Sequence, residues 1–463
     1  MLDGPAHLPL RDRAGRRALG AYVRHRQYVK NSFHFSVYFI ESPAKKHCFF
    51  AGVLLQYVPS RTFVVNSRTF DRSEKEGDAV KVAVLGYGTV GAGVYSMLSN
   101  APGMEAGPVL VRPGKAVENF MVSDAALIFG DPTVDAVVET LGGLDPAYSY
   151  GMRALEAGKH FITANKAMVA AHGLELAALA REKGAAFLFS AACGGGVPFL
   201  HNLALSAETD RIEAVSGILN GTTNYMLDAM QRRSLSYGDA LREAQSLGYA
   251  ESDPTADVSG LDALRKMQLA CAVAFGVLPQ SGMLCEGMEH FTAADVEDIQ
   301  SRGLVCRLMA RGSRAGESVS AYVEPVLFPR AAPESSVFTN NNMASYTGKR
   351  CGSIVLMGQG AGRFPTASAV LRDLSAAQQG ARSMFPENCR AAEADNREAV
   401  HSYYIRTGGF AAVRLPLRSV LAQGEVVRAV TEPMSAEKMH ALAQNIRKDG
   451  NDLFFAALEE KLC

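Results

Sequence analysis

The chain has 463 residues, of which 48% are hydrophobic and 20% are charged, and its formal net charge is zero. Such a composition excludes a fibrous or globally disordered protein and is typical of about two to four globular domains. Lys and Arg outnumber Asp and Glu within residues 1–72, so the remainder is mildly acidic. That charge argues against a nucleic-acid-binding surface across the main body.

The cysteines and the apolar segments bear on the compartment of the protein. The eight cysteines include no CxxC pair, and in a chain of this length they indicate reduced, mostly buried thiols of a cytosolic protein. The apolar segment CFFAGVLLQYV at residues 48–58 is shorter than the roughly 20 residues that a membrane helix needs. We therefore expect a cytoplasmic protein with neither a nucleic-acid nor a membrane partner.

Residues 1–78 differ from the rest of the chain, because they are Arg-rich and show no clear periodicity. Three interpretations are open: a disordered basic arm, a transit peptide, or an upstream stretch that is foreign to the native protein. We favour a functionally inert, poorly ordered basic extension. A nucleic-acid-binding function would depend on this segment alone.

From residue 80 onward, apolar strands alternate with helices. A strand, a glycine-rich turn and a helix come first, and further strands are predicted at 134–143, 159–165 and 185–191, with helices between them. This alternation predicts an α/β domain with a Rossmann-like, doubly wound parallel sheet over residues 79–195.

Two capped helices are predicted in the middle of the chain. One spans 236–249 and begins at Ser236, with Asp239 completing a capping box. The other spans 253–276, with Asp253 as its cap and a proline at its first position.

Three further segments complete the predicted architecture. Residues 196–364 form a second, α+β domain, and a helix near 365–380 packs back on the first domain. Residues 385–463 contain two strands, a helix and a final strand, which predict a small α+β appendix.

The loop after the first strand of the α/β domain has the sequence G-x-G-x-x-G, with glycines at Gly86, Gly88 and Gly91. Glycines at this spacing let the backbone approach a pyrophosphate at a helix N-terminus, so the loop predicts dinucleotide binding rather than a simple tight turn. The second strand lacks the acidic residue that would bind the ribose of NAD, and has Arg112 and Lys115 nearby. These cations favour the 2′-phosphate of NADP over NAD.

Two lysines and several carboxylates are candidates for catalysis. Lys166 comes directly after a strand, at the sheet edge where ligands bind, although a solvated surface charge is the alternative. Asp262 and Lys266 share one face of an apolar helix, either as an ion pair on a wet face or as a buried functional pair. With Glu251 and Asp257 just upstream, the set indicates a substrate that carries an ammonium group and proton transfer by lysine.

The segment GILNGTTNYML at residues 217–227 combines small and polar residues where a strand should pass into a helix. We expect a small charged molecule to dock beside it.

Six motifs together resemble the homoserine dehydrogenase family. The resemblance spans about Val80 to Leu374 and depends on GYGTVG, VVETLGG, AGKHFITANKAMVAAHG, GILNGTTNYML, LGYAESDPTADVSGLDALRK and GQGAGRFPTASAV. It implies NADPH-dependent, reversible reduction of L-aspartate 4-semialdehyde to L-homoserine, on the pathway to threonine, methionine and isoleucine. It also implies a homodimer or homotetramer, with residues 196–364 binding substrate and forming the dimer contact.

The resemblance also implies roles for individual residues. Lys266 corresponds to the proton donor, and Lys166 to a second active-site lysine that touches cofactor and substrate. Glu251 and Asp262 correspond to residues that hold the substrate, with Asp257 beside them. The implied cofactor-binding residues are Gly86, Gly88, Thr89, Val90, Gly91, Arg112, Thr140, Gly142, Lys166, Gly248, Gly360 and Gly362.

The chain departs from the family at Ser190, where the family has a glutamate. In the family that glutamate surrounds a sodium ion together with backbone carbonyls at the positions of Cys193, Gly195 and Val197. Ser190 removes the anionic ligand, so the resemblance leaves sodium binding open. Cys193 has no base nearby in sequence, which favours a buried structural thiol over a nucleophile.

Two further departures concern the loop after Gly91 and the tail. The segment between Gly91 and Asp135 is shorter than in the family. The tail after residue 385 resembles the family's regulatory ACT module in the strand YYIRT but lacks the glycine-marked effector turn, so its effector is left open. Another Rossmann reductase, such as an amino-acid dehydrogenase, and a cofactor-binding sensor without turnover are the alternative functions.

Overall fold

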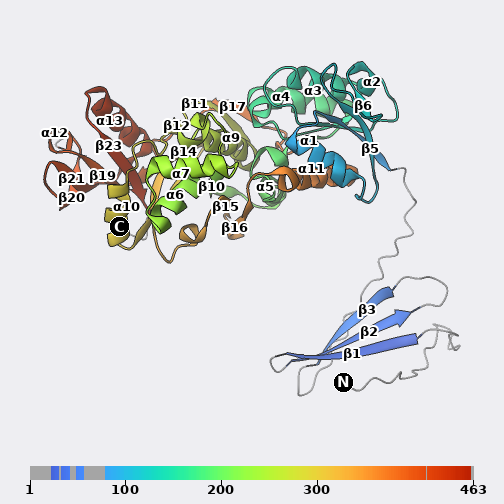
Figure 1. Cartoon of the computed structure of the whole chain (residues 1–463), viewed down its shortest axis with the longest axis horizontal. Coiled ribbons are helices and arrows are strands. Elements are labelled where there is room, and N and C mark those ends of the chain that lie inside the picture. The colour runs from blue at the N-terminus through green and yellow to red at the C-terminus, as the bar shows by residue number, and fades with distance from the viewer. Residues whose placement is uncertain (1–21, 31–32, 42–47, 57–78, 413, 460–463) are drawn as a thin grey trace. The chain divides into compact units, whose positions relative to one another are not determined.

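The computed structural model describes residues 22–30, 33–41, 48–56, 79–412 and 414–459 (Figure 1). The chain divides into two units, Met1–Gly77 and Asp78–Cys463. In the first unit three strands pair as an antiparallel sheet, namely β1 (Tyr22–Lys30), β2 (Phe33–Glu41) and β3 (Cys48–Gln56). The predicted poor order of residues 1–78 falls largely on residues outside this description and stays a prediction.

The second unit begins with a parallel six-stranded sheet in the described residues, which confirms the predicted Rossmann-like fold. The strand order is β6-β5-β4-β7-β8-β9, so the chain order reverses between β4 and β7. Ligands of open α/β sheets bind at such a reversal. The strands are β4 (Val80–Leu85), β5 (Met104–Leu110), β6 (Met121–Val122), β7 (Ala136–Glu139), β8 (His160–Thr163) and β9 (Phe187–Leu188).

Helices cover both faces of this sheet. In Figure 1 α3 and α4 lie above the sheet, and α1 and α11 lie below it. The late helix α11 packs closely on α1, because a Cβ at Gly93 would lie 2.8 Å from the Arg363 carbonyl oxygen. The helices are α1 (Thr89–Leu98), α2 (Ala126–Phe129), α3 (Ala147–Glu156), α4 (Lys166–Lys183) and α11 (Arg363–Gln378).

The middle of the chain forms an antiparallel sheet covered by helices. Its strands are β10 (Ile212–Ile218), β13 (Leu304–Ala315), β14 (Ser318–Pro329), β15 (Asn341–Gly348) and β16 (Gly352–Gln359), in the order β16-β15-β10-β13-β14. Its helices are α5 (Phe199–Thr209), α6 (Gly221–Arg233), α7 (Tyr237–Ser246), α8 (Thr255–Val258), α9 (Leu261–Phe275) and α10 (Ala293–Ser301). Shorter elements are β11 (Val277–Ser281), β12 (Leu284–Cys285), β17 (Arg390–Glu393), β18 (Val400–His401), β22 (Met434–Ser435) and the 3₁₀ turns Ser190–Ala192 and Pro333–Ser336.

The prediction of one continuous helix over 253–276 is wrong. The structure has two helices, α8 and α9, separated by Gly260, whose φ of +83° is incompatible with a right-handed helix. The apolar periodicity continues across the break, which is why the pattern alone did not reveal it. The cap predicted for α7 is confirmed, since the Ser236 hydroxyl accepts from the Asp239 amide at 3.1 Å.

The C-terminal elements form a βαββαβ unit of the ferredoxin-like type. They are β19 (Tyr403–Gly408), α12 (Gly409–Ala412), β20 (Leu417–Ala422), β21 (Val426–Thr431), α13 (Ala436–Lys448) and β23 (Leu453–Leu458). We refer to them as the C-terminal unit. Strand β23 pairs in parallel with β14, so the unit extends the sheet of the middle domain rather than standing apart from it.

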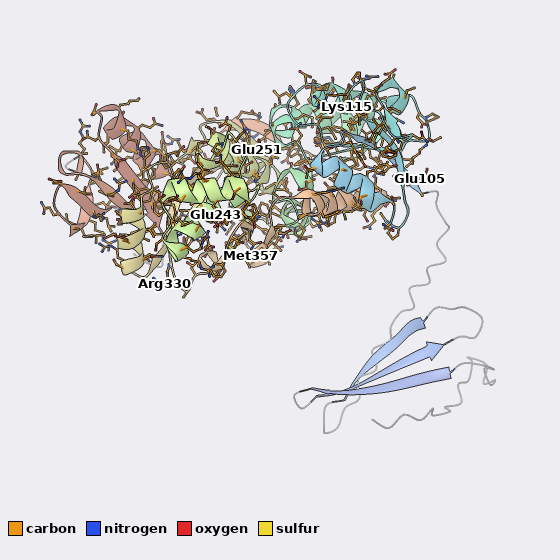
Figure 2. The ribbon with its side chains drawn as sticks, in the orientation of Figure 1. Glu105, Lys115, Glu243, Glu251, Arg330 and Met357 are labelled. Carbon is orange, nitrogen blue, oxygen red and sulfur yellow. The ribbon has the colours of Figure 1, made fainter. Side chains whose placement is uncertain are left out.

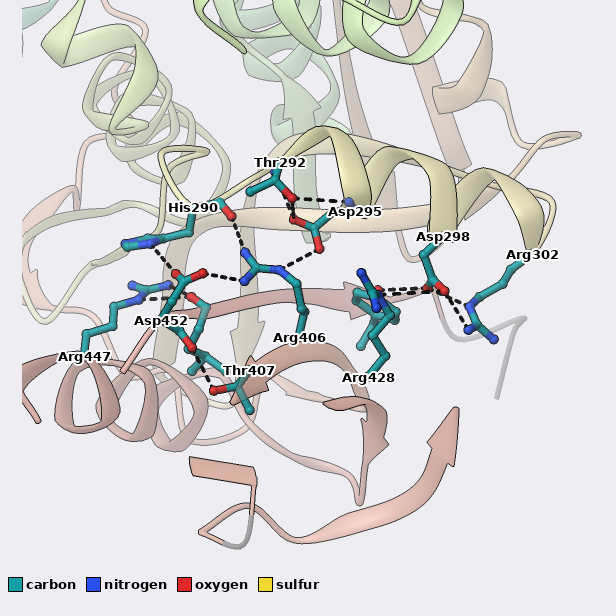
Figure 3. Close-up of polar contacts among 12 residues, drawn as sticks. His290, Thr292, Asp295, Asp298, Arg302, Arg406, Thr407, Arg428, Arg447 and Asp452 are labelled. Carbon is teal, nitrogen blue, oxygen red and sulfur yellow. Dashed lines mark hydrogen bonds and ion pairs between the residues drawn. The ribbon is translucent and has the colours of Figure 1, made fainter. Parts of the chain in front are cut away.

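Polar contacts reinforce this junction. Figure 3 shows Arg406 of β19 between Asp295 of α10 and Asp452, and Asp298 of α10 beside Arg428 of β21. None of the described helices is long and apolar enough to cross a membrane.

Candidate active site

The glycine-rich loop between β4 and α1 is tightly closed. Gly86 has a φ of +100°, and a Cβ at Gly91 would lie 2.1 Å from the Gly86 carbonyl oxygen. The Thr140 hydroxyl donates to the carbonyl oxygens of Leu85 at 3.0 Å and Gly86 at 3.3 Å. Both positions therefore require glycine, and Thr140 supports the loop from the end of the neighbouring strand β7.

One cleft of about 1000 Å³ lies beside this loop. The predicted cofactor residues that line it are Gly86, Gly88, Arg112, Lys115, Thr140 and Gly142. Tyr87 and Phe120 form an aromatic wall, with their ring centroids 5.8 Å apart. The cleft thus combines backbone amides, two cations and aromatic surface, which suits a nucleotide.

A buried carboxylate that was not predicted as functional shapes the edge of this cleft. Glu139 is fully buried and accepts hydrogen bonds from the amides of Leu141 at 2.6 Å and Gly142 at 3.1 Å, and from the Thr163 hydroxyl at 2.5 Å. Burial raises the pKa of Glu139, although these donors oppose that effect. In the sequence, Glu139 could have been recognised as a candidate because it is a carboxylate that ends an otherwise apolar strand.

A second cleft of about 630 Å³ lies between the Rossmann-like and middle domains. The predicted residues that line it are Val90, Lys166, Gly195, Gly248, Glu251, Asp257, Asp262, Lys266, Gly360 and Gly362. Thr89, Gly91, Cys193 and Val197 line neither of these two clefts. Lys115 lies on the Rossmann-like domain and Glu251 on the middle domain (Figure 2). The glycine loop borders both clefts, because Gly86 lines the first and Val90 the second.

Two lysines share one carboxylate in the second cleft. Lys266 Nζ lies 2.7 Å from Asp262 Oδ2, and Lys166 Nζ lies 3.0 Å from Asp262 Oδ1. Lys266 also donates to the Leu219 carbonyl oxygen at 2.5 Å. Lys266 and Asp262 are buried, whereas the Lys166 side chain is 35% exposed. The buried pair interpretation is therefore the one that the structure supports.

Burial and charge act against each other at this pair. Burial opposes the charge of Lys266, but Asp262 outweighs it and raises the lysine pKa above its usual range. Burial likewise opposes ionisation of Asp262, but Lys266, Lys166 and Asn220 together hold the aspartate pKa well below its usual range. Lys266 is therefore an ammonium and Asp262 a carboxylate at neutral pH.

The segment GILNGTTNYML organises the carboxylates. The Asn220 amide donates to Asp257 Oδ1 at 2.7 Å and to Asp262 Oδ2 at 2.9 Å, while its oxygen caps α6 through the Thr223 amide. The Thr222 hydroxyl shares its proton between the Tyr249 carbonyl oxygen at 2.6 Å and Asp257 Oδ2 at 3.0 Å. The sequence predicts a small charged molecule beside this segment, and Asn220, Gly221 and Thr222 line the second cleft. The Asn220 amide donates to both aspartates and holds them in the cleft wall.

Comparison with known proteins agrees with this geometry. The model of the homoserine dehydrogenase family matches residues 198–375, and that of the homoserine dehydrogenase NAD-binding domain matches residues 86–190. The homoserine dehydrogenase of Corynebacterium glutamicum is 38% identical over 327 residues, which cover 66% of this chain and 73% of that protein. This chain belongs to the homoserine dehydrogenase family.

Other relatives and solved structures show the same similarity. The homoserine dehydrogenase of Synechocystis is 37% identical, over 64% of this chain and 72% of that protein. The crystal structure of a homoserine dehydrogenase from Thiobacillus denitrificans is 29% identical with a TM-score of 0.73, and covers 82% of this chain and 98% of that one. The S. aureus homoserine dehydrogenase at pH 8.5 is 26% identical with a TM-score of 0.65, over 82% and 99% of the two chains.

Ser190 stands at the position where the resemblance implies a glutamate. Its hydroxyl donates to Asp373 Oδ1 at 2.6 Å and its amide to Asp373 Oδ2 at 2.8 Å. The Val197 carbonyl oxygen already accepts from the Phe199 amide at 2.7 Å. Ser190 therefore contributes a hydroxyl rather than a carboxylate at this position, and its polar partner is the Asp373 carboxyl group.

Cys193 shows no sign of nucleophilic function. It is fully buried, and burial raises the pKa of its thiol to about 12. A thiol with such a pKa is almost wholly protonated at neutral pH, so a structural role fits.

Proposed function

We propose that the protein is an NAD(P)-dependent homoserine dehydrogenase that reversibly reduces L-aspartate 4-semialdehyde to L-homoserine with NADPH. The observation that carries this proposal is the Lys266–Asp262–Lys166 cluster in a cleft bordered by the glycine-rich loop. The function places the protein on the pathway to threonine, methionine and isoleucine, as the resemblance of its motifs implies.

Lys266 is the proposed proton donor. An ammonium has three N–H donors. Lys266 donates one to the Leu219 carbonyl oxygen and one to Asp262. The third is available to an aldehyde oxygen in the cleft. As negative charge develops on that oxygen, Nζ stabilises it and then transfers a proton to give the alcohol. The raised pKa keeps Lys266 protonated and ready for this role.

The acidic residues of the cleft provide a site for the amino group of the substrate. Glu251 is exposed in the cleft, and Asp257 lies opposite the end of α6, fixed by Asn220 and Thr222. An ammonium group binds favourably beside carboxylates in a partly desolvated cleft. Lys166 and Lys266 balance the negative charge. In this proposal Lys166, at the N-terminus of α4, contacts both substrate and cofactor.

NADPH is the preferred cofactor in this proposal, with NADH as the weaker alternative. When bound, NADPH supplies the hydride. Gly86, Gly88 and the start of α1 would hold its pyrophosphate, and Arg112 with Lys115 would hold the 2′-phosphate. Turnover requires no sodium in this proposal, because Ser190 replaces the anionic ligand. The homodimer or homotetramer implied by the resemblance is part of the same proposal.

Steady-state kinetics with both cofactors test this function. The purified protein is mixed with L-aspartate 4-semialdehyde and either NADPH or NADH. Loss of the absorbance of the reduced nicotinamide is followed, and homoserine is identified by chromatography. We expect homoserine to form, with a higher kcat/KM for NADPH. Binding of NADPH without any turnover would instead support a cofactor-binding sensor.

A further inference from the structure

The break between α8 and α9 is held in place by residues 285–288. The Met288 amide donates to the Val258 carbonyl oxygen at 3.0 Å, and the Cys285 thiol contacts the Ser259 carbonyl oxygen at 3.1 Å. A Cβ at Gly287 would lie 2.2 Å from the Val258 carbonyl oxygen. The two backbones are therefore in direct contact.

This contact adjoins the proposed chemistry. Asp257 precedes the break on α8, while Asp262 and Lys266 lie beyond it on α9. Asn220 bridges the two sides by donating to both aspartates. The separation of α8 from α9 thus sets the distance between the two carboxylates.

The C-terminal unit contacts residues 285–288 through an ion pair between Arg447 and Glu286. Glu286 accepts from Arg447 Nη1 at 2.9 Å and from Nη2 at 2.7 Å, and the guanidinium also donates to the Leu453 carbonyl oxygen at 2.7 Å. The Glu286 side chain is 10% exposed and that of Arg447 is 20% exposed. A bidentate pair with so little exposure fixes orientation as well as distance.

A second contact holds residues 290–295. Arg406 donates to the His290 carbonyl oxygen and to Asp295 Oδ1, both at 2.8 Å, and also pairs with Asp452 (Figure 3). The C-terminal unit thus contacts both ends of the segment 286–295.

We propose that Glu286 and Arg447 are positioning residues for the active site, because their ion pair fixes residues 286–288 beside the α8–α9 break and thereby sets Asp257 relative to Asp262 and Lys266. The C-terminal unit then stabilises the geometry of the catalytic cleft. Removing Arg447 leaves a nearly buried carboxylate without its partner, so Glu286 turns toward water and residues 286–288 withdraw from Val258. Small displacements of this kind have large effects on rates.

Kinetics of four variants test this proposal. Arg447→Met, Glu286→Gln and the double variant remove the pair, and Arg447→Lys keeps the charge without the bidentate geometry. Arg302→Met is the matched control, since Arg302 makes a bidentate pair with Asp298 at 2.9 Å in the same region but does not contact residues 285–288. All are assayed well below their melting temperatures.

We expect kcat/KM for the semialdehyde to fall about tenfold or more in Arg447→Met, with the KM for NADPH unchanged. Arg447→Lys recovers part of the loss, and the double variant is no worse than the worse single variant, because both lose one shared interaction. Arg302→Met keeps wild-type constants. Should Arg447→Met fail to fold, Arg447→Lys and Glu286→Gln carry the same test.

Hydrogen exchange of the ligand-free protein gives a readout that does not depend on activity. We expect faster amide exchange over residues 255–264 in Arg447→Met and unchanged exchange there in Arg302→Met. Unchanged exchange and unchanged kinetics in Arg447→Met would overturn the proposal. The kinetic arm rests on the proposed function, so an inactive wild type would overturn that function, whereas the exchange arm would still decide the positioning role.

Discussion

Asp262 and Lys266 lie one helical turn apart on α9, and the 2.7 Å contact between Oδ2 and Nζ is buried at the wall of a cleft. The same carboxylate binds Lys166 through its other oxygen at 3.0 Å. One anion thus holds two cations in place, and it determines the protonation of the one that is buried.

Replacing Asp262 by Asn lowers the pKa of Lys266, because the carboxylate that most strongly opposes the effect of burial is then lost and only the weaker influence of Asp257 remains. A proton donor acts below its pKa and fails above it, so the alkaline limb of the pH–rate profile for semialdehyde reduction moves to lower pH. At neutral pH we expect kcat/KM to fall by about 100-fold or more. Asp228→Asn is the control, since Asp228 is similarly buried but contacts neither lysine. An unshifted profile in Asp262→Asn would refute the assigned coupling.

Replacing Asn220 by Ala removes both the cap of α6 and the bridge between Asp257 and Asp262. Loss of a cap costs about 1 kcal/mol of stability, and loss of the bridge lowers activity as well. Ser236→Ala removes the cap of α7 and should cost similar stability without changing turnover. Denaturant unfolding and steady-state kinetics of the two variants are compared. Equal activities would show that Asn220 is only a cap.

Replacing Arg112 by Ala weakens NADPH binding selectively. Arg112 lines the nucleotide cleft, and a cation there has a partner in the 2′-phosphate of NADPH but none in NADH. We expect the KM for NADPH to rise about tenfold, equivalent to about 1.4 kcal/mol, with the KM for NADH nearly unchanged. Equal effects on both cofactors would place Arg112 elsewhere on the nucleotide.

Asp373 makes the stability of the protein depend on pH. In the folded state, burial raises the pKa of Asp373 from its ordinary value of 3.8 to about 7. The folded state therefore binds more protons than the unfolded state between about pH 4 and 7, so this residue's contribution to stability falls as pH rises through that window. We expect Asp373→Asn to remove this decline, which amounts to a few kcal/mol at most. Thermal unfolding at pH 5 and pH 8 measures it, with Asp239→Asn as an exposed control. A parallel decline in Asp373→Asn would contradict the assignment.

We expect the activity of the protein to be independent of sodium, because Ser190 supplies no carboxylate to bind the ion. Ser190 donates to Asp373 with both its amide and its hydroxyl, so the loop is fixed without a cation. Activity is measured in sodium, potassium and choline chloride at constant ionic strength. Equal rates are the expected result, and a requirement for sodium would show that backbone carbonyls suffice to bind it.

Local features of the fold were predictable from the sequence. Periodicity identified β4, β7, β8 and the helices between them, and the glycine spacing located the loop at Gly86 because only glycine permits its backbone. The i, i+4 spacing placed Asp262 beside Lys266. These features are set by neighbours in the sequence, and for that reason the pattern was sufficient.

Features that depend on distant partners were not predictable. The pairing of β14 with β23 joins Val326 to Ala457 and turns an expected appendix into part of the central sheet. The partners of Asn220 lie 37 and 42 residues away, so the role of its amide was visible only in three dimensions. Glu286 and Arg447 are separated by 161 residues, and neither stands in a recognisable motif.

The role of Lys266 is tested by the turnover of NADPH with L-aspartate 4-semialdehyde in wild type and in Lys266→Ala, with NADPH binding measured in parallel by fluorescence. The assigned role of Lys266 predicts homoserine formation by the wild type, a loss of about 1000-fold in kcat for the variant, and the same Kd for NADPH in both. A variant that retained wild-type turnover would contradict the claim that Lys266 delivers the proton.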